Sequence, residues 1–288
     1  MKIIHFLATI AAGSLLCWPA SAAPSADDAN SAKPKTDVAP PKKSAAPATN
    51  NFAEPNLVTE DANSPFEKPG QTYLFVGARF RYVIIPKFYI NMFASGGATV
   101  GVPAFGPELT IRKDRFEYVL SLMYASYGMD PTPFKSKTDL PQAWELVDSS
   151  LKSLYVMSDF SWSSPVDPKF SIIYGAGFGI GIVFGDLGRT QAFPGSGGVN
   201  DPYTYLPCPG PLPAGFPNAD FCTNDNKHYP GYSEPSWTDG GSKPVVFPWL
   251  SLQTGLRFKP TKQFMARLDV GWNLFNGPFF GLAGNYGL

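Results

Sequence analysis

The 288-residue sequence contains little charge, little histidine and little cysteine. Charged residues make up 16% of it, and 23 basic residues balance 23 acidic ones to a net charge of zero. Soluble globular chains usually carry about a quarter charged residues. Because the basic residues are scattered singly and show no excess, nucleic acid is excluded as a partner. Beyond the first 22 residues there is also no apolar run of about 18 residues, which excludes a transmembrane helix.

The N-terminus has the pattern of a secretory signal peptide over residues 1–22. Lys2 supplies the positive charge, residues 3–16 are mostly apolar, and a small-residue site ends at Ala22. Cys17 raises the alternative of a lipoprotein, but the bulky neighbours of this cysteine fit lipoprotein cleavage poorly. Cleavage after Ala22 is therefore favoured, and the sequence predicts an exported protein.

Residues 23–68 differ in composition from the rest of the chain. The stretch is rich in Ala, Pro, Ser, Asp, Asn and Lys and has almost no branched or aromatic residues. Such a segment cannot bury enough apolar surface to fold. We interpret it as a disordered, Pro/Ala-rich periplasmic tether that is partly extended by its prolines.

A glycine-rich alternating segment at 170–184 gives the clearest structural signal. Its even positions hold only apolar or aromatic residues, and most of its odd positions are glycine or another small residue. A period of two places these sets on opposite faces of one strand, and a large apolar face opposite a small one suits a strand between lipid and a crowded barrel lumen. The alternative, a phosphate-binding G-x-G-x-x-G loop, would need glycine at Ile180.

From residue 70 onward the alternation recurs, and aromatic residues are plentiful at 15% of the chain. The connections also alternate in length, with short turns on one side and longer loops on the other, as in outer-membrane barrels. The sequence therefore predicts an all-β fold over 70–288, an eight-stranded antiparallel up-and-down transmembrane β-barrel. The eight predicted strands are 72–85, 99–112, 115–127, 150–162, 170–184, 245–258, 264–275 and 279–288.

Two predicted strands are irregular. Strand 99–112 contains Gly106 and Pro107, which predict a β-bulge because proline cannot donate to a strand ladder. Strand 150–162 places Lys152 and Ser158 on the predicted lipid-facing side. Lys152 fits the external interface, whereas the sequence offers no explanation for Ser158.

The charged residues of the predicted strands fall repeatedly on the inward face. Such a set is very costly in hydrocarbon but can pair inside a narrow lumen. One interpretation is a selectivity or substrate-binding lining. The favoured alternative is a salt-bridged plug, because eight strands leave room for little but side chains. The set consists of Arg79, Arg81, Glu108, Arg112, Glu117, Asp159, Arg257, Arg267 and Asp269.

The long segment 185–244 is predicted to be an external loop. It contains Cys208 and Cys222, which in an exported chain indicate a disulfide. Two free thiols are the alternative, and a zinc site is less favoured because only His228 lies near. The loop is either a recognition surface or an inert, disulfide-bonded segment. Its candidate recognition residues are Tyr203, Tyr205, Tyr229, Tyr232 and Trp237.

Catalytic chemistry has little support in the sequence. Beyond residue 22 the chain has one histidine, His228, with Asp220 and Asp225 nearby in the long loop. A lipid-modifying enzyme would need such a group on a rigid scaffold at lipid level. The stretch 218–226 is rich in side-chain oxygens but lacks the spacing of a calcium loop. We expect no enzyme activity, no metal and no cofactor.

Together, these features resemble the small OmpA/OmpX-type outer-membrane barrels over about residues 70–288. More narrowly, the segments GYSEPSWTDGGSKP (231–244), GLRFKP (255–260) and FFGLAGNYGL (279–288) resemble a myxobacterial (deltaproteobacterial) family of outer-membrane barrels. The resemblance implies the outer membrane of a Gram-negative bacterium and assembly by the outer-membrane insertion machinery, and it implies no activity.

The resulting hypothesis is an integral outer-membrane barrel with a structural or surface-recognition role. Its expected partners are outer-membrane lipid, the insertion machinery and a glycan or protein ligand at the external loops. Two alternatives stay open at this point. One is a narrow transport pore in which the inward arginines select anions, and the other is a lipid-modifying enzyme.

Overall fold

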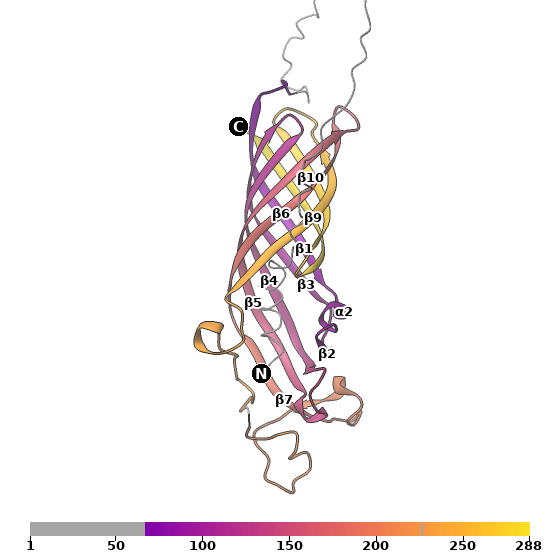
Figure 1. Ribbon diagram of the computed structural model, residues 1–288, viewed down its shortest axis with the longest axis vertical. Helices are drawn as coiled ribbons and strands as arrows, with labels where there is room; N and C mark the ends of the chain where they lie inside the picture. The colour runs from indigo at the N-terminus through magenta and orange to yellow at the C-terminus, as the bar shows by residue number, and fades with distance from the viewer. Residues whose placement is uncertain (1–66, 226) are drawn as a thin grey trace, which may run out of the picture.

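The computed structural model describes residues 67–225 and 227–288, and it shows a closed antiparallel barrel (Figure 1). Each barrel strand pairs with the next one along the chain, and β1 also pairs with β11, so the sheet closes on itself. The predicted all-β, eight-stranded fold is confirmed. The barrel strands are β1 (Thr72–Ile85), β3 (Val100–Lys113), β4 (Phe116–Ser136), β5 (Glu145–Pro165), β6 (Phe170–Phe184), β9 (Val246–Phe258), β10 (Phe264–Asn273) and β11 (Gly277–Gly287).

The predicted N-terminal segments fall almost entirely outside this description. The signal peptide at 1–22 and all of the tether except its last two residues lie outside the described residues. Both segments stay predictions.

The two ends of the barrel differ in the length of their connections. Short turns join the strands at the end where the C-terminus lies. Longer segments join them at the opposite end, where β2 and β7 are labelled in Figure 1, except for the short turn 274–276 between β10 and β11. In outer-membrane barrels the short turns are periplasmic and the long loops external. We therefore call these the periplasmic end and the external end.

The long external connections contain more structure than the sequence predicted. Strands β4 and β5 continue beyond the barrel as a hairpin, so the predicted loop at 128–149 is mostly strand. The expected loop at 185–244 contains β7 (Leu187–Phe193), which pairs with β5, and β8 (Leu206–Pro207). The connection after β1 holds α2 (Lys87–Ile90) and β2 (Ala94–Gly96), which pairs with β4. Three short 3₁₀ helices are Pro141–Ala143, Pro202–Thr204 and Trp237–Asp239.

The bulge predicted at Gly106 and Pro107 is wrong. The register between β1 and β3 runs without a shift from the pair Thr72–Lys113 to the pair Ile85–Val100. The β3–β4 ladder has no pairs at Gly106 and Pro107 but keeps the same register on both sides of them, so no extra residue is inserted. The register shifts instead between Met129 and Thr132 of β4, on either side of Pro131. Proline is tolerated at such irregular positions of a sheet.

The outward face of every barrel strand is mostly apolar and exposed. A soluble protein rarely exposes a continuous apolar surface of this kind, whereas a barrel in lipid requires one. The molecule is therefore a membrane-spanning barrel of the outer-membrane type. One representative from each strand is Phe80, Phe105, Leu122, Val156, Ile180, Leu252, Leu268 and Leu282.

None of the helices within residues 67–225 and 227–288 is long and apolar enough to cross a membrane.

The two polar outward residues of β5 have separate explanations. Lys152 is exposed and pairs across the sheet with Phe184, the last residue of β6, which places it at the external edge of the apolar band. The hydroxyl of Ser158 lies 3.1 Å from the hydroxyl of Tyr118 on the neighbouring strand. Ser158 thus shares a hydrogen bond within the lipid-facing surface, which offsets the cost of its polarity.

The glycines of β6 face the lumen, as predicted, and they make room for side chains of β5. A Cβ at Gly177 would lie 2.0 Å from Oδ1 of Asp159, and one at Gly181 would lie 2.7 Å from the ring of Tyr155. At Gly177 and Gly181 the nearest neighbours are thus side chains of β5, and Asp159 in turn binds Arg79 and Arg81.

The lumen has two layers. Toward the external end, a cluster of buried apolar and aromatic residues includes Tyr127, Tyr155, Trp249 and Phe279. Toward the periplasmic end, the inward side chains are charged, and all nine predicted lumen residues are buried. The alternation therefore placed every predicted inward charge on the correct face.

Candidate functional site

The charged layer of the lumen centres on two arginines of β1. Arg79 forms ion pairs with Asp159 and, at 2.8 Å from its Nε, with Glu108. Arg81 lies 2.9 Å from Asp159, and its Nη2 donates to Gln253 at 2.6 Å. Arg79 and Arg81, successive inward residues of β1, thus bind carboxylates on β3 and β5. The network therefore connects different parts of the barrel wall across the lumen.

Three further residues, Arg267, Asn285 and Asp269, belong to this upper part of the network. Arg267 donates to both oxygens of Glu108, at 2.6 and 2.7 Å, and Asn285 donates to the same carboxylate at 2.6 Å. Asp269 accepts from Nε of Arg81 at 3.4 Å. Both oxygens of Glu108 thus accept hydrogen bonds, whereas Asp159 and Asp269 each bind arginine through Oδ2 and leave Oδ1 without a partner among the described residues. Pairing with donors is the condition under which buried charges are tolerated.

A second group of ion pairs lies nearer the periplasmic end, around Glu117. Its carboxylate pairs with Arg257, with Arg112 at 3.1 Å and with Arg267 at 3.8 Å. Arg112 also pairs with Glu67, a residue just before β1. The Glu67 carboxylate pairs with Lys259 as well. The structure therefore joins all nine predicted lumen residues into one set of contacts and adds Glu67 and Lys259 to it.

The aromatic layer above the charges is also closely packed. The hydroxyls of Tyr127 and Tyr155 lie 2.6 Å apart, and the Tyr155 ring packs edge-on against Trp249. The guanidinium of Arg81 stacks 4.8 Å from the Phe279 ring centroid, an arrangement that favours a cation over an aromatic face. Ions and aromatic rings therefore occupy the interior at two successive levels.

The external region is built on the β4–β5 hairpin and on β7, and a second ionic cluster connects them. Arg189 of β7 pairs with Glu145 of β5 at 2.6 Å and with Glu234 at 3.1 Å. Nδ1 of His228 lies 2.7 Å from the other oxygen of Glu145, and the His228 ring stacks on Tyr232. His228, expected to have no role, is thus a buried structural residue of the loop.

The electrostatics of this cluster favour an ionised Glu145. Burial alone raises the pKa of its carboxyl, but the hydrogen bond with His228 and the charge of Arg189 outweigh burial and bring the pKa below its ordinary value of 4.5. The long loop therefore depends on a charged carboxylate near the tip of the β4–β5 extension.

The predicted disulfide between Cys208 and Cys222 is confirmed, with the two Cα atoms 5.6 Å apart. The backbone NH of Cys208 donates to the carbonyl of Gln191 on β7 at 2.8 Å. Next to it, Trp144, Ala192 and Tyr205 form a small buried apolar cluster. The loop therefore has a core of its own, which the disulfide holds against β7.

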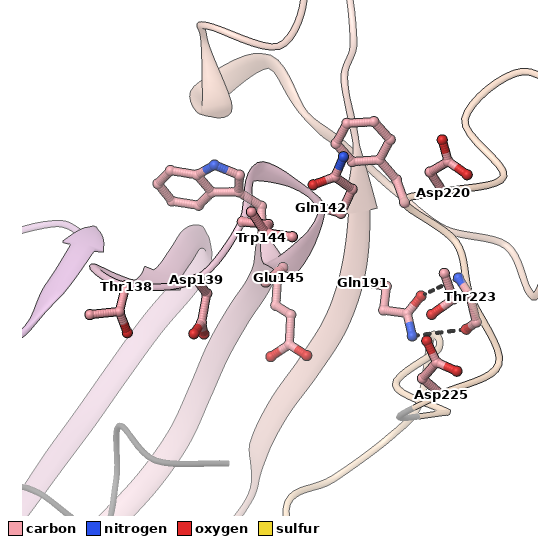
Figure 2. Close-up of a pocket in the computed structure, with 12 residues that line it drawn as sticks. Thr138, Asp139, Gln142, Trp144, Glu145, Gln191, Asp220, Thr223 and Asp225 are labelled. Carbon is pink, nitrogen blue, oxygen red and sulfur yellow. Dashed lines mark hydrogen bonds between the residues drawn. The ribbon is translucent and has the colours of Figure 1, made fainter.

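An open pocket of about 450 Å³ lies at the tip of this region. Figure 2 shows Trp144 and Glu145 on one side and the loop with Asp220, Thr223 and Asp225 on the other, with Gln191 between them. The side chain of Gln191 is fixed by two hydrogen bonds to the Thr223 backbone, at 2.9 and 3.0 Å. The remaining lining residues are Thr138, Asp139, Leu140, Gln142, Ala143 and Phe221.

The five aromatic residues predicted for recognition have mostly internal contacts. Tyr205 is only 5% exposed, and the hydroxyl of Tyr229 donates to the Thr223 carbonyl at 2.5 Å. Tyr232 stacks on His228, and Nε1 of Trp237 donates to the Ser242 carbonyl at 3.0 Å. Tyr203 is 54% exposed, and its hydroxyl bonds to Gly97. Their role in recognition stays a prediction, and Tyr203 is the most accessible of them.

The residues considered for metal or catalytic chemistry have different roles in the fold. Asp220 and Asp225 line the pocket together with Glu145, and His228 is buried against Glu145 and stacks on Tyr232. Among the described residues, there is no group of three or more histidine, cysteine or acidic side chains that could hold a metal ion.

Several important residues were missed by sequence reasoning. Glu67 was assigned to the tether and Lys259 to a turn, and neither position carries a periodic signal. Gln253 and Asn285 are inward residues without charge, so the search for charges omitted them. Glu145, Arg189 and Glu234 lay in segments interpreted as loops. The seven residues of β7 show no alternating burial, so no local pattern indicates Arg189.

Comparison with known proteins adds little beyond the fold. No family model matches this chain, and no curated protein matches it. Ail of Yersinia pestis, solved in complex with the heparin analogue sucrose octasulfate, is 10% identical with a TM-score of 0.34 and covers 77% of this chain and 100% of its own. Neisserial surface protein A is 9% identical with a TM-score of 0.37, covering 75% and 96%. The N-terminal β-barrel domain of Pseudomonas aeruginosa OprF is 13% identical with a TM-score of 0.30, covering 76% and 99%.

At these identities and TM-scores, the likenesses carry no inference about what this chain binds. The narrower resemblance to myxobacterial barrels stays a prediction.

Proposed function

We propose that this chain is an outer-membrane barrel protein with a surface-recognition role that it exercises through its folded external region. The observation that carries the proposal is the pocket of about 450 Å³ at the tip, framed by the disulfide-bearing loop. Exposed loops held on a rigid scaffold commonly carry recognition. The filled lumen supports the same conclusion, because it leaves the external region as the part of the molecule that can take a ligand.

The pocket lining favours a polyhydroxylated, neutral or cationic ligand. Asp139, Asp220 and Asp225 supply carboxylates, Gln142 adds an amide, and Leu140 adds an apolar contact. Ligand sites typically combine apolar walls with a few polar groups that fix orientation. Because like charges repel across an interface, the carboxylates disfavour acidic glycans and acidic peptides.

A binding experiment tests this proposal directly. The full-length protein in lipid nanodiscs is applied to an array of neutral, amino-sugar and acidic glycans, and to a panel of basic and acidic peptides. We expect binding to a neutral or basic class and a loss of about tenfold or more in affinity for the D220N/D225N variant, since charged hydrogen bonds contribute about 1.5–3 kcal/mol.

Asp130→Asn is the matched control, because Asp130 is an exposed aspartate of β4 outside the pocket. This variant should bind as the wild type does. Binding that is confined to acidic ligands, or that is equal in all three proteins, would contradict the proposed site.

A second candidate function, the narrow anion pore, has one observation in its favour. The nine predicted lumen residues comprise five arginines and four carboxylates, and all are buried. The close packing of charges and aromatic rings opposes it, so the inward residues serve better as a plug.

The proposal assigns no catalytic role. Replacing His228 by alanine tests the lipid-modifying alternative, and the lipid profile of cells producing this variant should equal that of the wild type. The predicted kinship with myxobacterial barrels and assembly by the outer-membrane insertion machinery form part of the same proposal. Their support is the motifs 231–244, 255–260 and 279–288 and the closed barrel fold.

A further inference from the structure

The periplasmic mouth of the barrel contains a carboxylate that comes from outside the strands. Glu67 precedes β1, and its carboxylate pairs with Arg112 of β3 and with Lys259, which follows β9. The Glu67 side chain is 12% exposed, and those of Arg112 and Lys259 are 8% and 5% exposed. Two buried cations from different parts of the barrel thus converge on one anionic group.

The charges of the barrel itself are unbalanced at this end. Without Glu67, the three cations Arg112, Arg257 and Lys259 would share one carboxylate among the ion pairs at this end, that of Glu117. Arg267 also approaches Glu117, at 3.8 Å. Buried charges need compensation, because desolvation without a partner costs several kcal/mol. The barrel strands therefore require an anion here that they do not supply.

We propose that the periplasmic mouth is an exchangeable oxyanion-binding site formed by Arg112, Arg257 and Lys259, which the Glu67 carboxylate occupies in this structure and for which a carboxylate or phosphate of the periplasm competes. This site is independent of the external pocket and lies at the opposite end of the barrel.

The cations are held in place by contacts other than Glu67. Arg257 donates to the hydroxyl of Ser171 at 2.9 Å, and Arg112 donates to the carbonyl of Asp114 at 3.2 Å. The backbone NH of Lys259 bonds to the carbonyl of Lys169 at 2.8 Å, and its ammonium lies 5.5 Å from the ring centroid of Phe75. The site is therefore preorganised and would persist when Glu67 leaves it.

The local electrostatics agree with an anion site. Burial lowers the pKa of the Lys259 ammonium, hydrogen bonding and charge attraction from Glu67 raise it, and the charges of Arg112 and Arg257 lower it. An incoming anion would replace the favourable contribution of Glu67. Arginine together with lysine suits both carboxylate and phosphate, since the guanidinium presents a planar set of donors.

The covalent connection of Glu67 to β1 determines how strongly a free anion can compete. A group linked by a short segment has an effective concentration in the millimolar range. Free phosphate must therefore exceed that range to displace Glu67 from the wild-type site. Removing the charge of Glu67 should expose the site to much lower phosphate concentrations.

The test is a titration of the folded full-length protein in detergent micelles with inorganic phosphate, followed by ³¹P NMR in a constant-ionic-strength chloride buffer. We expect the E67Q variant to bind phosphate at least about tenfold more tightly than the wild type, and the E67Q/K259M variant to lose this gain. Asp167→Asn is the matched control, because Asp167 is an exposed carboxylate in another periplasmic turn, where it accepts from the NH of Lys169.

The control should bind phosphate like the wild type, and heat-modified gel mobility shows that each variant is folded. Equal phosphate affinity of E67Q and wild type overturns the proposal, as does equal affinity of E67Q and E67Q/K259M. If E67Q does not fold, E67D takes its place, because it withdraws the carboxylate by one methylene and should give the same ranking with a smaller gain. Equal phosphate affinity of E67D and wild type would then also overturn the proposal.

Discussion

Individual glycines of β6 determine whether the ionic network of the lumen can form. Asp159 of β5 binds both Arg79 and Arg81, and its carboxylate lies where a side chain at Gly177 would be. A methyl group at this position cannot coexist with Asp159 in its present place. Glycine at position 177 of β6 is thus required for the salt bridges that Asp159 of β5 forms.

Replacing Gly177 by alanine should therefore destabilise the barrel. Its Cβ would lie 2.0 Å from Asp159 Oδ1, so Asp159 must move away from its two arginines. Overpacking of this kind costs about 1–3 kcal/mol, and weakening a buried ion pair adds to it. The measurement is the midpoint of guanidinium unfolding in lipid vesicles.

Gly284→Ala is the control, because a Cβ there meets no atom within 4 Å. This variant should unfold near the wild-type midpoint. A Gly177→Ala protein as stable as the wild type would show that the Asp159 contacts do not depend on this glycine.

The charge of Glu145 predicts how the external region responds to pH. The folded-state pKa of Glu145 is lowered, so its ionised form stabilises this region above the ordinary pKa of 4.5, which applies in the unfolded state. That stability is lost as the pH falls through the lower folded-state value. Arg189 and His228 bond to Glu145, Glu234 bonds to Arg189, and Asp139, Asp220 and Asp225 line the same pocket as Glu145.

The expected result is a decrease in the thermal midpoint of the external region, followed by tryptophan fluorescence, as the pH decreases from 6 to 3. The Glu145→Gln variant should start with a lower midpoint at pH 6 and show a flatter pH profile. An unchanged pH profile in this variant would assign the effect to other carboxylates.

At the scale of elements, the disulfide closes a segment of the long loop beside β7, to which the backbone NH of Cys208 bonds. Cys208 and Cys222 are fully buried beside the cluster of Trp144, Ala192 and Tyr205. A disulfide that closes a loop of this length contributes about 3 kcal/mol in the chain-entropy model. Replacing both cysteines by alanine should make the loop more sensitive to proteases while leaving the barrel intact.

The measurement is the rate of chymotrypsin cleavage in proteoliposomes, located by mass spectrometry. We expect cleavage between residues 200 and 235 to become at least about tenfold faster, because local opening is favoured by more than 1.4 kcal/mol. The heat-modified gel mobility of the barrel should not change. Equal cleavage rates in the two proteins would show that the loop core holds without the disulfide.

The sequence predicted the eight barrel strands because each has one face in lipid and one in a packed lumen. This contrast produces an alternation with a period of two in the sequence, as in the lipid-facing Phe178 next to the lumen-facing Gly177. It disappears in the external hairpin, where Pro131 and Pro133 interrupt β4 and both faces meet protein or water. The same loss explains why β7 was interpreted as loop, since its seven residues include Gly188 and Arg189 within an otherwise irregular segment.

The candidate sites were predictable only in part. The inward charges followed from alternation, but their pairing did not, because Arg79 and Asp159 are far apart in sequence and meet only when the barrel closes. Glu67 had no signal at all, since its role depends on the position of Lys259 across the mouth. The pocket likewise combines residues of the 3₁₀ helix Pro141–Ala143 with a loop that is distant in sequence and that no local pattern connects to it.

At the scale of the whole molecule, the barrel is filled along its length by three successive arrangements. Glu67 lies with Arg112 and Lys259 at the periplasmic mouth, the arginine–carboxylate network fills the middle, and the aromatic cluster with Tyr155 and Trp249 lies toward the external end. The external region then extends beyond the barrel on the β4–β5 hairpin (Figure 1). This order separates a packed membrane part from an accessible external part.

A filled lumen predicts that the protein does not conduct ions. Full-length protein reconstituted into planar bilayers should give no stepwise conductance at voltages up to about 100 mV, where an elementary charge gains about 2.3 kcal/mol. That energy is small beside the cost of leaving a buried carboxylate unpaired, about 3–5 kcal/mol for a broken pair. The R79A/R81A variant should also be silent, since the aromatic cluster above it stays in place. A large porin serves as the positive control for insertion and recording, and anion-selective steps in the wild type that disappear in R79A/R81A would instead establish the narrow pore.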